Sequence, residues 1–95
     1  MDYVFEITDK SGRRIHLSKE RWNEHIRPLH PGIREPEELI KVLESPDKVL
    51  ESDRDESVRW YFLYSKQKKK YLKVSIKYLN GEGHVITAHY TRKIC

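Results

Sequence analysis

Strict alternation of apolar and polar side chains marks the C-terminal third of the chain. It runs through Tyr71–Tyr78 and again through His84–Thr91. Successive side chains of a β-strand point to opposite faces, so each segment has one apolar and one polar face. The apolar face predicts a core side made of Leu72, Val74, Ile76, Ile86, Ala88 and Tyr90. The polar face sets cations, hydroxyls and an imidazole on an open surface: Lys73, Ser75, Lys77, Thr87, His89 and Thr91.

The two segments are close enough in sequence to form a hairpin, and their pattern predicts its register. A two-residue turn would put Ser75 and Ile86 on one face, which mixes polar with apolar side chains. A three-residue loop over 80–82 keeps the two faces separate and is a common hairpin connection. We therefore expect the longer loop, which sets Lys73 beside His89.

The segment Val58–Tyr64 precedes this hairpin and also predicts a strand, with a short strand over 48–51 before it. Short connections favour an antiparallel meander of four strands. In the preceding strand we expect a core side of Val58, Trp60, Phe62 and Tyr64. On the polar side we expect Arg59, Tyr61 and Leu63.

The N-terminal half predicts a hairpin followed by two helices. Strands over 3–7 and 13–17 flank a turn, Ser18 can cap a helix that runs to about Arg27, and Pro36 suits the first turn of a second helix. The expected fold is a single α+β domain over residues 1–95: an N-terminal hairpin and two helices packed on one face of a four-stranded antiparallel sheet. The other sheet face would then be bare.

Composition narrows the class of protein. The formal charge is +4 and the isoelectric point about 9.2, a basic bias that suits a polyanionic partner. The one cysteine, Cys95, excludes an internal disulfide and a cysteine-based zinc site. No stretch approaches 18 apolar residues, and nothing at the start resembles a signal peptide. We expect a soluble cytoplasmic protein without a membrane partner or a cofactor.

The polar face offers the chemistry of phosphodiester transfer. A neighbouring cation such as Lys73 would favour the neutral form of His89, and a neutral imidazole can act as a general base. Cleavage from an RNA 2′-hydroxyl also needs cations at the non-bridging oxygens, for which we nominate Arg59, Lys73 and Lys77. Hydroxyls that can orient the phosphate are Thr87, Thr91 and Tyr61, and Tyr61 can equally stack on a base. The plainer interpretation is a solvated sheet face with no ligand.

A catalytic metal is not expected. His25 and His30 are five positions apart and do not match the i, i+4 pair of helical zinc sites. No carboxylate stands at ligand spacing beside His89. We assign His16 and His84 structural roles only.

Several short motifs resemble a known group of nucleases. They are Trp22-x-x-His25-Ile26, His30-Pro31, Leu43-x-x-Pro46-Asp47, Tyr71-Leu72-Lys73-Val74 and Val85-Ile86-Thr87-Ala88-His89-Tyr90-Thr91. Over about residues 16–94 the chain is similar to the phage- and mobile-element-associated barnase–EndoU–colicin–RelE (BECR) nucleases. The resemblance implies an α+β fold and a metal-independent endoribonuclease activity, often in toxin modules. It nominates His25, His30, Lys73, Thr87, His89 and Thr91.

Our first hypothesis is therefore a small metal-independent endoribonuclease that cleaves tRNA or mRNA by 2′-hydroxyl transesterification, and the resemblance implies the toxin type. Its general acid or base would be His25 or His89. The catalytic set would be His25, His30, Lys73, Thr87 and His89, and the RNA-binding set Arg59, Tyr61, Lys77 and Thr91. The alternatives are a non-catalytic RNA- or protein-binding module that uses the basic face, and an interaction protein with no nucleic-acid role. A toxin of this kind would have an acidic inhibitor protein as a second partner.

Overall fold

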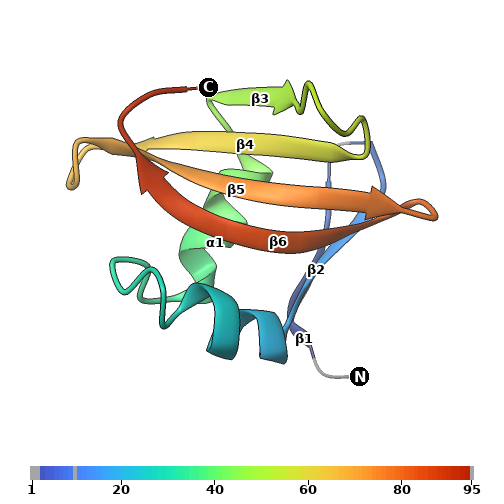
Figure 1. Cartoon of the computed structure of the whole chain (residues 1–95), viewed down its shortest axis with the longest axis horizontal. Helices are drawn as coiled ribbons and strands as arrows, with labels where there is room; N and C mark the ends of the chain where they lie inside the picture. The colour runs from blue at the N-terminus through green and yellow to red at the C-terminus, as the bar shows by residue number, and fades with distance from the viewer. Residues whose placement is uncertain (1–2, 10, 95) are drawn as a thin grey trace.

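A computed structural model describes residues 3–9 and 11–94. Six strands form one mixed sheet in the spatial order β1-β2-β6-β5-β4-β3 (Figure 1). Their bounds are β1 (Tyr3–Thr8), β2 (Arg14–Ser18), β3 (Lys48–Glu51), β4 (Val58–Ser65), β5 (Lys70–Leu79) and β6 (Glu82–Thr91). Two short helical segments, η1 (Arg21–Ile26) and α1 (Pro36–Glu44), lie between β2 and β3.

The expected four-stranded antiparallel sheet is wrong, because the N-terminal hairpin joins the sheet. Its inner strand β2 pairs in parallel with β6, where Ile15 lies opposite Gly83 and His16 opposite His84. Gly83 permits this approach, since a Cβ at that position would lie 3.0 Å from Ile15 Cγ1 and 2.9 Å from Ile76 Cγ2. The pairing joins segments nearly 70 residues apart, and local sequence patterns carry no signal for it.

The first helical segment is a π-helix and is shorter than the helix expected to run to about Arg27, whereas α1 begins at Pro36 as expected. In η1 the N–H of Arg27 donates to the carbonyl of Trp22 at 2.9 Å, a π-helical bond, and the predicted cap Ser18 accepts the N–H of Arg21 at 3.0 Å. In α1 the carboxylate of Glu38 accepts the N–H groups of Arg34 and Glu35 at 2.8 and 3.0 Å, which closes the first turn.

The two sides of β4 are the reverse of those predicted. Tyr61 pairs with Val74 and Leu63 with Leu72, and directly opposed residues of a sheet share a face. The core side of β4 therefore carries Arg59, Tyr61 and Leu63. The other side carries Trp60, Phe62 and Tyr64, and it is the side on which Lys73 and Ser75 lie.

The β5–β6 hairpin combines the two registers that the sequence offered. Asn80 and Gly81 form a two-residue turn, so the predicted three-residue loop is wrong. A bulge at Ile86 then shifts the register by one residue, and the expected pairing of Lys73 with His89 is confirmed. The bulge also makes Val85 the buried residue, 4% exposed, where we expected Ile86.

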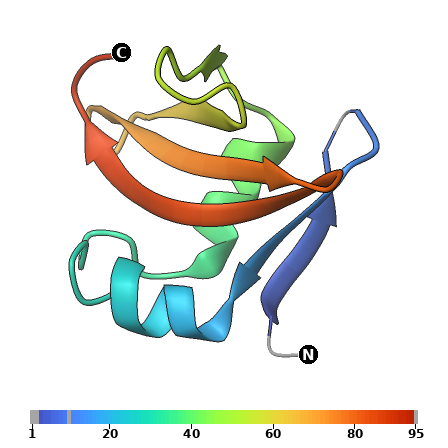
Figure 2. The same ribbon diagram turned by 45° about the vertical axis from the view of Figure 1, so that its right-hand side comes forward.

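The core lies between the sheet and the helical segments. α1 packs against β4 and β5, and η1 packs against β6 and β2 (Figure 2). The fully buried side chains include Ile15, Leu17, Ile26, Ile33, Leu39, Val74, Ile76 and Ala88. Among the described residues, no helix is both long and apolar enough to cross a membrane.

Candidate functional site

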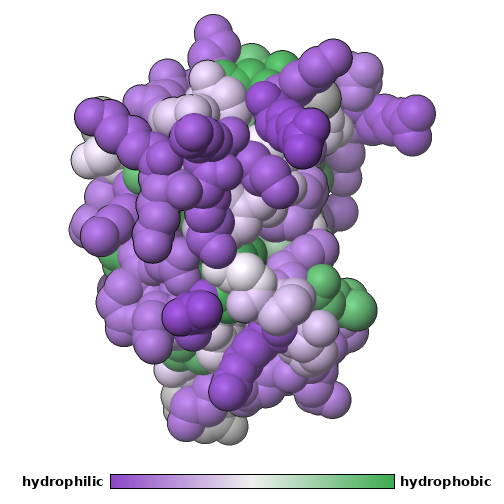
Figure 3. Space-filling view, turned by 90° about the vertical axis from the view of Figure 1, so that its left-hand side faces the viewer, coloured by the Kyte–Doolittle hydropathy of each residue, from purple (hydrophilic) through white to green (hydrophobic). Residues whose placement is uncertain are grey.

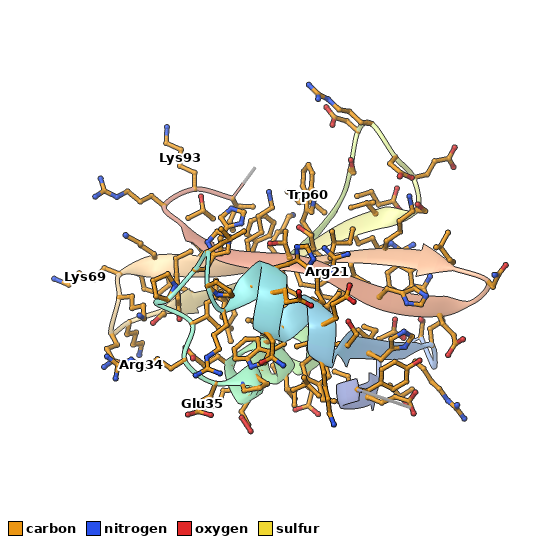
Figure 4. All side chains as sticks on the ribbon, turned by 60° about the horizontal axis from the view of Figure 1, so that its bottom comes forward. Arg21, Arg34, Glu35, Trp60, Lys69 and Lys93 are labelled. Carbon is orange, nitrogen blue, oxygen red and sulfur yellow. The ribbon has the colours of Figure 1, made fainter. Side chains whose placement is uncertain are left out.

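The sheet side away from α1 and η1 carries a mixed aromatic and polar surface, which we call the open face. Its members come from three neighbouring strands: Trp60 and Phe62 of β4, Lys73 and Ser75 of β5, and Thr87 and His89 of β6. Figure 4 shows Trp60 rising from the side of the sheet opposite the helical segments. Trp60 is partly exposed, whereas Phe62 is fully buried beneath its neighbours.

Lys73 lies at the centre of the open face. Its Nζ is 4.1 Å from the centre of the Trp60 ring and 5.8 Å from that of Phe62, and it shares a register position with His89. A cation over an aromatic face is attracted by the ring quadrupole. The ammonium group thus lies over the Trp60 ring, and His89 stands opposite Lys73 on the neighbouring strand.

A second histidine reaches the open face from outside the sheet. The rings of His30 and His89 lie 5.7 Å apart, centre to centre, with an angle of 32° between their planes. β2 pairs only with residues 82–84 of β6, so the rest of that strand edge is left to η1 and the chain that follows it. The N–H of His30 donates to the carbonyl of Ile26 at 2.8 Å, which ties His30 to the end of η1.

The environment of His89 favours its neutral form. Burial lowers the pKa of His89, and the charges of Lys73 and His30 lower it further. A neutral imidazole at neutral pH can accept a proton, which is the requirement for a general base.

Basic side chains gather at the end of the sheet nearest His89. The turn between β4 and β5 holds Lys66, Lys68 and Lys69, and the segment after β6 adds Arg92 and Lys93. Figure 4 shows Lys69, Arg34 and Lys93 projecting outward at this end. Viewed from that side, most of the surface is hydrophilic, with small hydrophobic patches between the polar side chains (Figure 3).

Internal contacts hold this basic end together. Lys68 Nζ donates to the carbonyl of Gly32 at 2.9 Å and lies 4.8 Å from the centre of the Tyr90 ring. The Tyr90 hydroxyl donates to Glu38 Oε1 at 3.0 Å, and burial together with the Glu38 charge raises the pKa of Tyr90 to about 12. The loop that carries His30 is thus joined to the β4–β5 turn and to α1.

The structure separates the predicted site residues into two groups. It brings together His30, Lys73, Thr87 and His89, whereas His25 is exposed on η1. Lys77 Nζ contacts Asp55 Oδ2 at 3.2 Å. Thr91 ends β6, where its Oγ1 lies 3.3 Å from the carbonyl oxygen of Lys93.

Two predicted RNA-binding residues lie on the core side of β4. Tyr61 is 6% exposed, and its hydroxyl bonds that of Tyr78 at 2.5 Å, so its ring offers no surface for stacking. Arg59 lies 3.6 Å from Glu51. The partly exposed aromatic ring on the open face is that of Trp60, the residue before Tyr61 in the chain.

Comparison with protein families, with curated proteins and with solved structures finds no match to this chain.

Proposed function

We propose that this protein is a metal-independent endoribonuclease that cleaves RNA on the open face. The observation that carries the proposal is the approach of His30 to His89 at 5.7 Å, with Lys73 opposite His89 on the neighbouring strand. Two imidazoles and a cation on one surface supply the proton acceptor, the proton donor and the charge stabilisation that transesterification needs.

In the proposed reaction, neutral His89 takes the proton of the RNA 2′-hydroxyl while that oxygen attacks the adjacent phosphorus. The bond from phosphorus to the 5′-oxygen breaks, and protonated His30 donates its proton to the leaving oxygen. The products are a 2′,3′-cyclic phosphate and a 5′-hydroxyl end. Lys73 stabilises the negative charge that develops on the non-bridging oxygens. The Thr87 hydroxyl helps to orient the phosphate, because Thr87 lies two residues before His89 in β6 and on the same face.

The test is incubation of the purified protein with mixed RNA in EDTA, followed by analysis of the product ends. We expect shortened RNA with 2′,3′-cyclic phosphate ends. His30→Ala and His89→Ala should each lower the rate by at least ~10²-fold. Lys41→Gln, on the exposed side of α1, serves as the control and should retain the activity.

The same series tests the assignment of the general acid. His25→Ala that lowered the rate more than His30→Ala would transfer the role to η1 and contradict our assignment. Intact RNA under all conditions would refute the enzyme.

A non-catalytic RNA-binding module is the second candidate, and one observation favours it. Trp60 stands beside Lys73 on the open face, and an aromatic ring next to a cation is the arrangement that binds single-stranded nucleic acid by stacking. Binding that weakens steeply with salt, without any shortened product, would support this module against the ribonuclease.

A further inference from the structure

A histidine and two glutamates converge on β1, β2 and β6, at the end of the sheet opposite to His89. Glu6 of β1 lies opposite His16 of β2, and Glu82 begins β6, the strand that β2 joins in parallel. One carboxylate oxygen of each glutamate and one ring nitrogen of His16 all lie within 4.8 Å of one another. The two strands of the N-terminal hairpin and the distant strand β6 therefore direct ligand-type atoms to one place.

The histidine of this cluster is held rigidly. His16 is 5% exposed, its ring stacks on that of Tyr3 at 4.3 Å, and the edge of His84 meets it at 4.2 Å. Its Nδ1 is buried and has no hydrogen-bond partner among the described residues. A buried ring nitrogen without a partner is unusual, since buried polar atoms are nearly always satisfied by hydrogen bonds or by ions.

Neither carboxylate forms an ion pair in the part of the chain that the structure describes, although Arg14 lies opposite Glu82 in the β2–β6 pairing. The ion pairs found there involve Asp9, Glu51 and Asp55, and none includes Glu6 or Glu82. Two carboxylates that share a site with a buried imidazole repel each other unless a positive charge lies between them.

We propose that Glu6, His16 and Glu82 form a binding site for a divalent first-row transition metal ion such as Zn²⁺. Imidazole and carboxylate ligands suit such ions, and Zn²⁺ binds three protein ligands with water in a fourth position. Ligand bonds of about 2.0–2.2 Å require the three atoms to lie roughly 3.3–3.6 Å apart. Glu6 and Glu82 are both exposed, so rotation about their side-chain bonds closes the site around the rigid His16.

The position of the site gives the ion a structural effect. β2 pairs with β6 over only three residue pairs, 14–16 with 82–84, and the cluster spans this junction. An ion held by β1, β2 and β6 therefore fastens the N-terminal hairpin to the sheet. Binding to the folded state alone raises stability with metal concentration, and it does so independently of any activity on RNA.

The test is a calorimetric titration with Zn²⁺ of protein that has been treated with EDTA and dialysed. The absorption spectrum of bound Co²⁺ then reports the geometry of the ligands. We expect one ion per chain and a rise of the melting temperature on the order of 10 °C at a free Zn²⁺ concentration 100 times the dissociation constant. Glu6→Gln and Glu82→Gln should each weaken binding about tenfold or more. Both positions are exposed, so neither variant should disturb the fold, and Glu44→Gln on α1 is the matched control.

Two outcomes would overturn the proposal. One is a Zn²⁺ affinity equal in the wild type and in both glutamine variants, which would place the ion elsewhere. His30→Ala then shows whether the ion binds at the His30–His89 pair. The other is a melting temperature that does not respond to Zn²⁺ or Co²⁺. His16→Gln should abolish binding, and because it changes a buried side chain its fold is checked by circular dichroism.

Discussion

Lys73 and His89 lie directly opposite each other on β5 and β6, and the bulge at Ile86 puts them there. From the Asn80-Gly81 turn alone, the pairs Lys77–His84 and Ile76–Val85 would continue in step and place Lys73 opposite residue 88. The extra residue shifts the second half of β6 so that its polar positions meet those of β5. A local irregularity of the backbone thereby assembles the centre of the candidate site.

Removing the Lys73 charge should raise the pKa of His89. The ammonium group disfavours a proton on the nearby imidazole, so Lys73→Gln relieves that repulsion while burial continues to act. The measurement is an NMR titration of the His89 ring in both proteins. Lys77→Gln is the control, since Lys77 contacts Asp55 and lies further along the same strand. An unchanged or lower pKa of His89 in Lys73→Gln would show that the two side chains do not interact in solution.

His89 should make the protein less stable as the solution becomes acidic. Its pKa in the folded protein lies below the ordinary value of 6.5, so the unfolded chain takes up the proton first as the pH falls. The free energy of unfolding should therefore decrease as the pH drops through about 6.5. The pH dependence of the free energy of unfolding should be shallower in His89→Gln than in the wild type. The dependence of Lys73→Gln should lie between those of the wild type and His89→Gln.

Urea denaturation at a series of pH values between 5 and 8 measures this slope. The buried His16 also has a lowered pKa, so a residual dependence is expected in every variant. A His89→Gln slope equal to that of the wild type would contradict the lowered pKa of His89.

The sequence predicted the local elements of this fold better than their assembly. Alternation located β5 and β6 within two residues of their observed ends, because a strand with one buried face must alternate. Alternation did not predict the faces of β4, because aromatic residues occur on both sides of this strand: Trp60, Tyr61, Phe62 and Tyr64. With large apolar groups on both sides, hydrophobicity alone does not decide which side faces the core.

The remaining errors concern contacts between distant segments. The parallel pairing of β2 with β6 depends on the absence of a side chain at Gly83, which no periodicity reveals. His30 was nominated from a motif, but its approach to His89 depends on the edge of β6 that the short β2 leaves open. Convergence of this kind is a property of the assembled sheet and of the loop that passes its edge.

Gly83→Ala should destabilise the protein. The added Cβ would meet Ile76 Cγ2 at 2.9 Å, and Ile15 Cγ1 and Tyr78 Cε1 at 3.0 Å, at the junction of three strands. Forcing a methyl group into such a packed position costs about 1–3 kcal/mol, measured by urea denaturation. Leu79→Ala, a substitution at an exposed position in β5, is the control. If Gly83→Ala had the same free energy of unfolding as the wild type, β2 and β6 would separate readily at this position.

The lysines of the β4–β5 turn should set the salt dependence of RNA binding. Glutamine at Lys66 and Lys69 of the turn and at Lys70, which begins β5, removes three charges at this end of the sheet. Lys68, which bonds Gly32, stays in place. Each lost phosphate contact should reduce the slope of log affinity against log salt by about 0.7 for single-stranded RNA. A triple glutamine variant at Arg14, Lys19 and Lys41, which are exposed and lie outside the β4–β5 turn, has the same net charge and should keep the wild-type slope. Equal slopes in the two triple variants would mean that RNA does not bind at this end.

Trp60 should contribute to RNA affinity by stacking, whether or not the protein cleaves its ligand. Base–aromatic stacking contributes roughly 1–3 kcal/mol per base, so Trp60→Ala should weaken binding by about 5- to 150-fold. Trp60→Tyr keeps a ring and should retain most of the affinity. Fluorescence anisotropy with a labelled single-stranded RNA in EDTA measures both, with His89→Gln as the background so that the ligand stays intact.

The Trp60 ring also supports the Lys73 ammonium, so part of the loss in Trp60→Ala is a displaced cation. A double-mutant cycle with Lys73→Gln separates the two effects. If the ring acts only through Lys73, then Trp60→Ala should have no effect in the Lys73→Gln background, and stacking on Trp60 is ruled out. If the ring binds a base, most of the loss persists in that background. RNA binding should then quench the fluorescence of Trp60 in Trp22→Phe, because Trp22 is buried in the core and the open face holds Trp60.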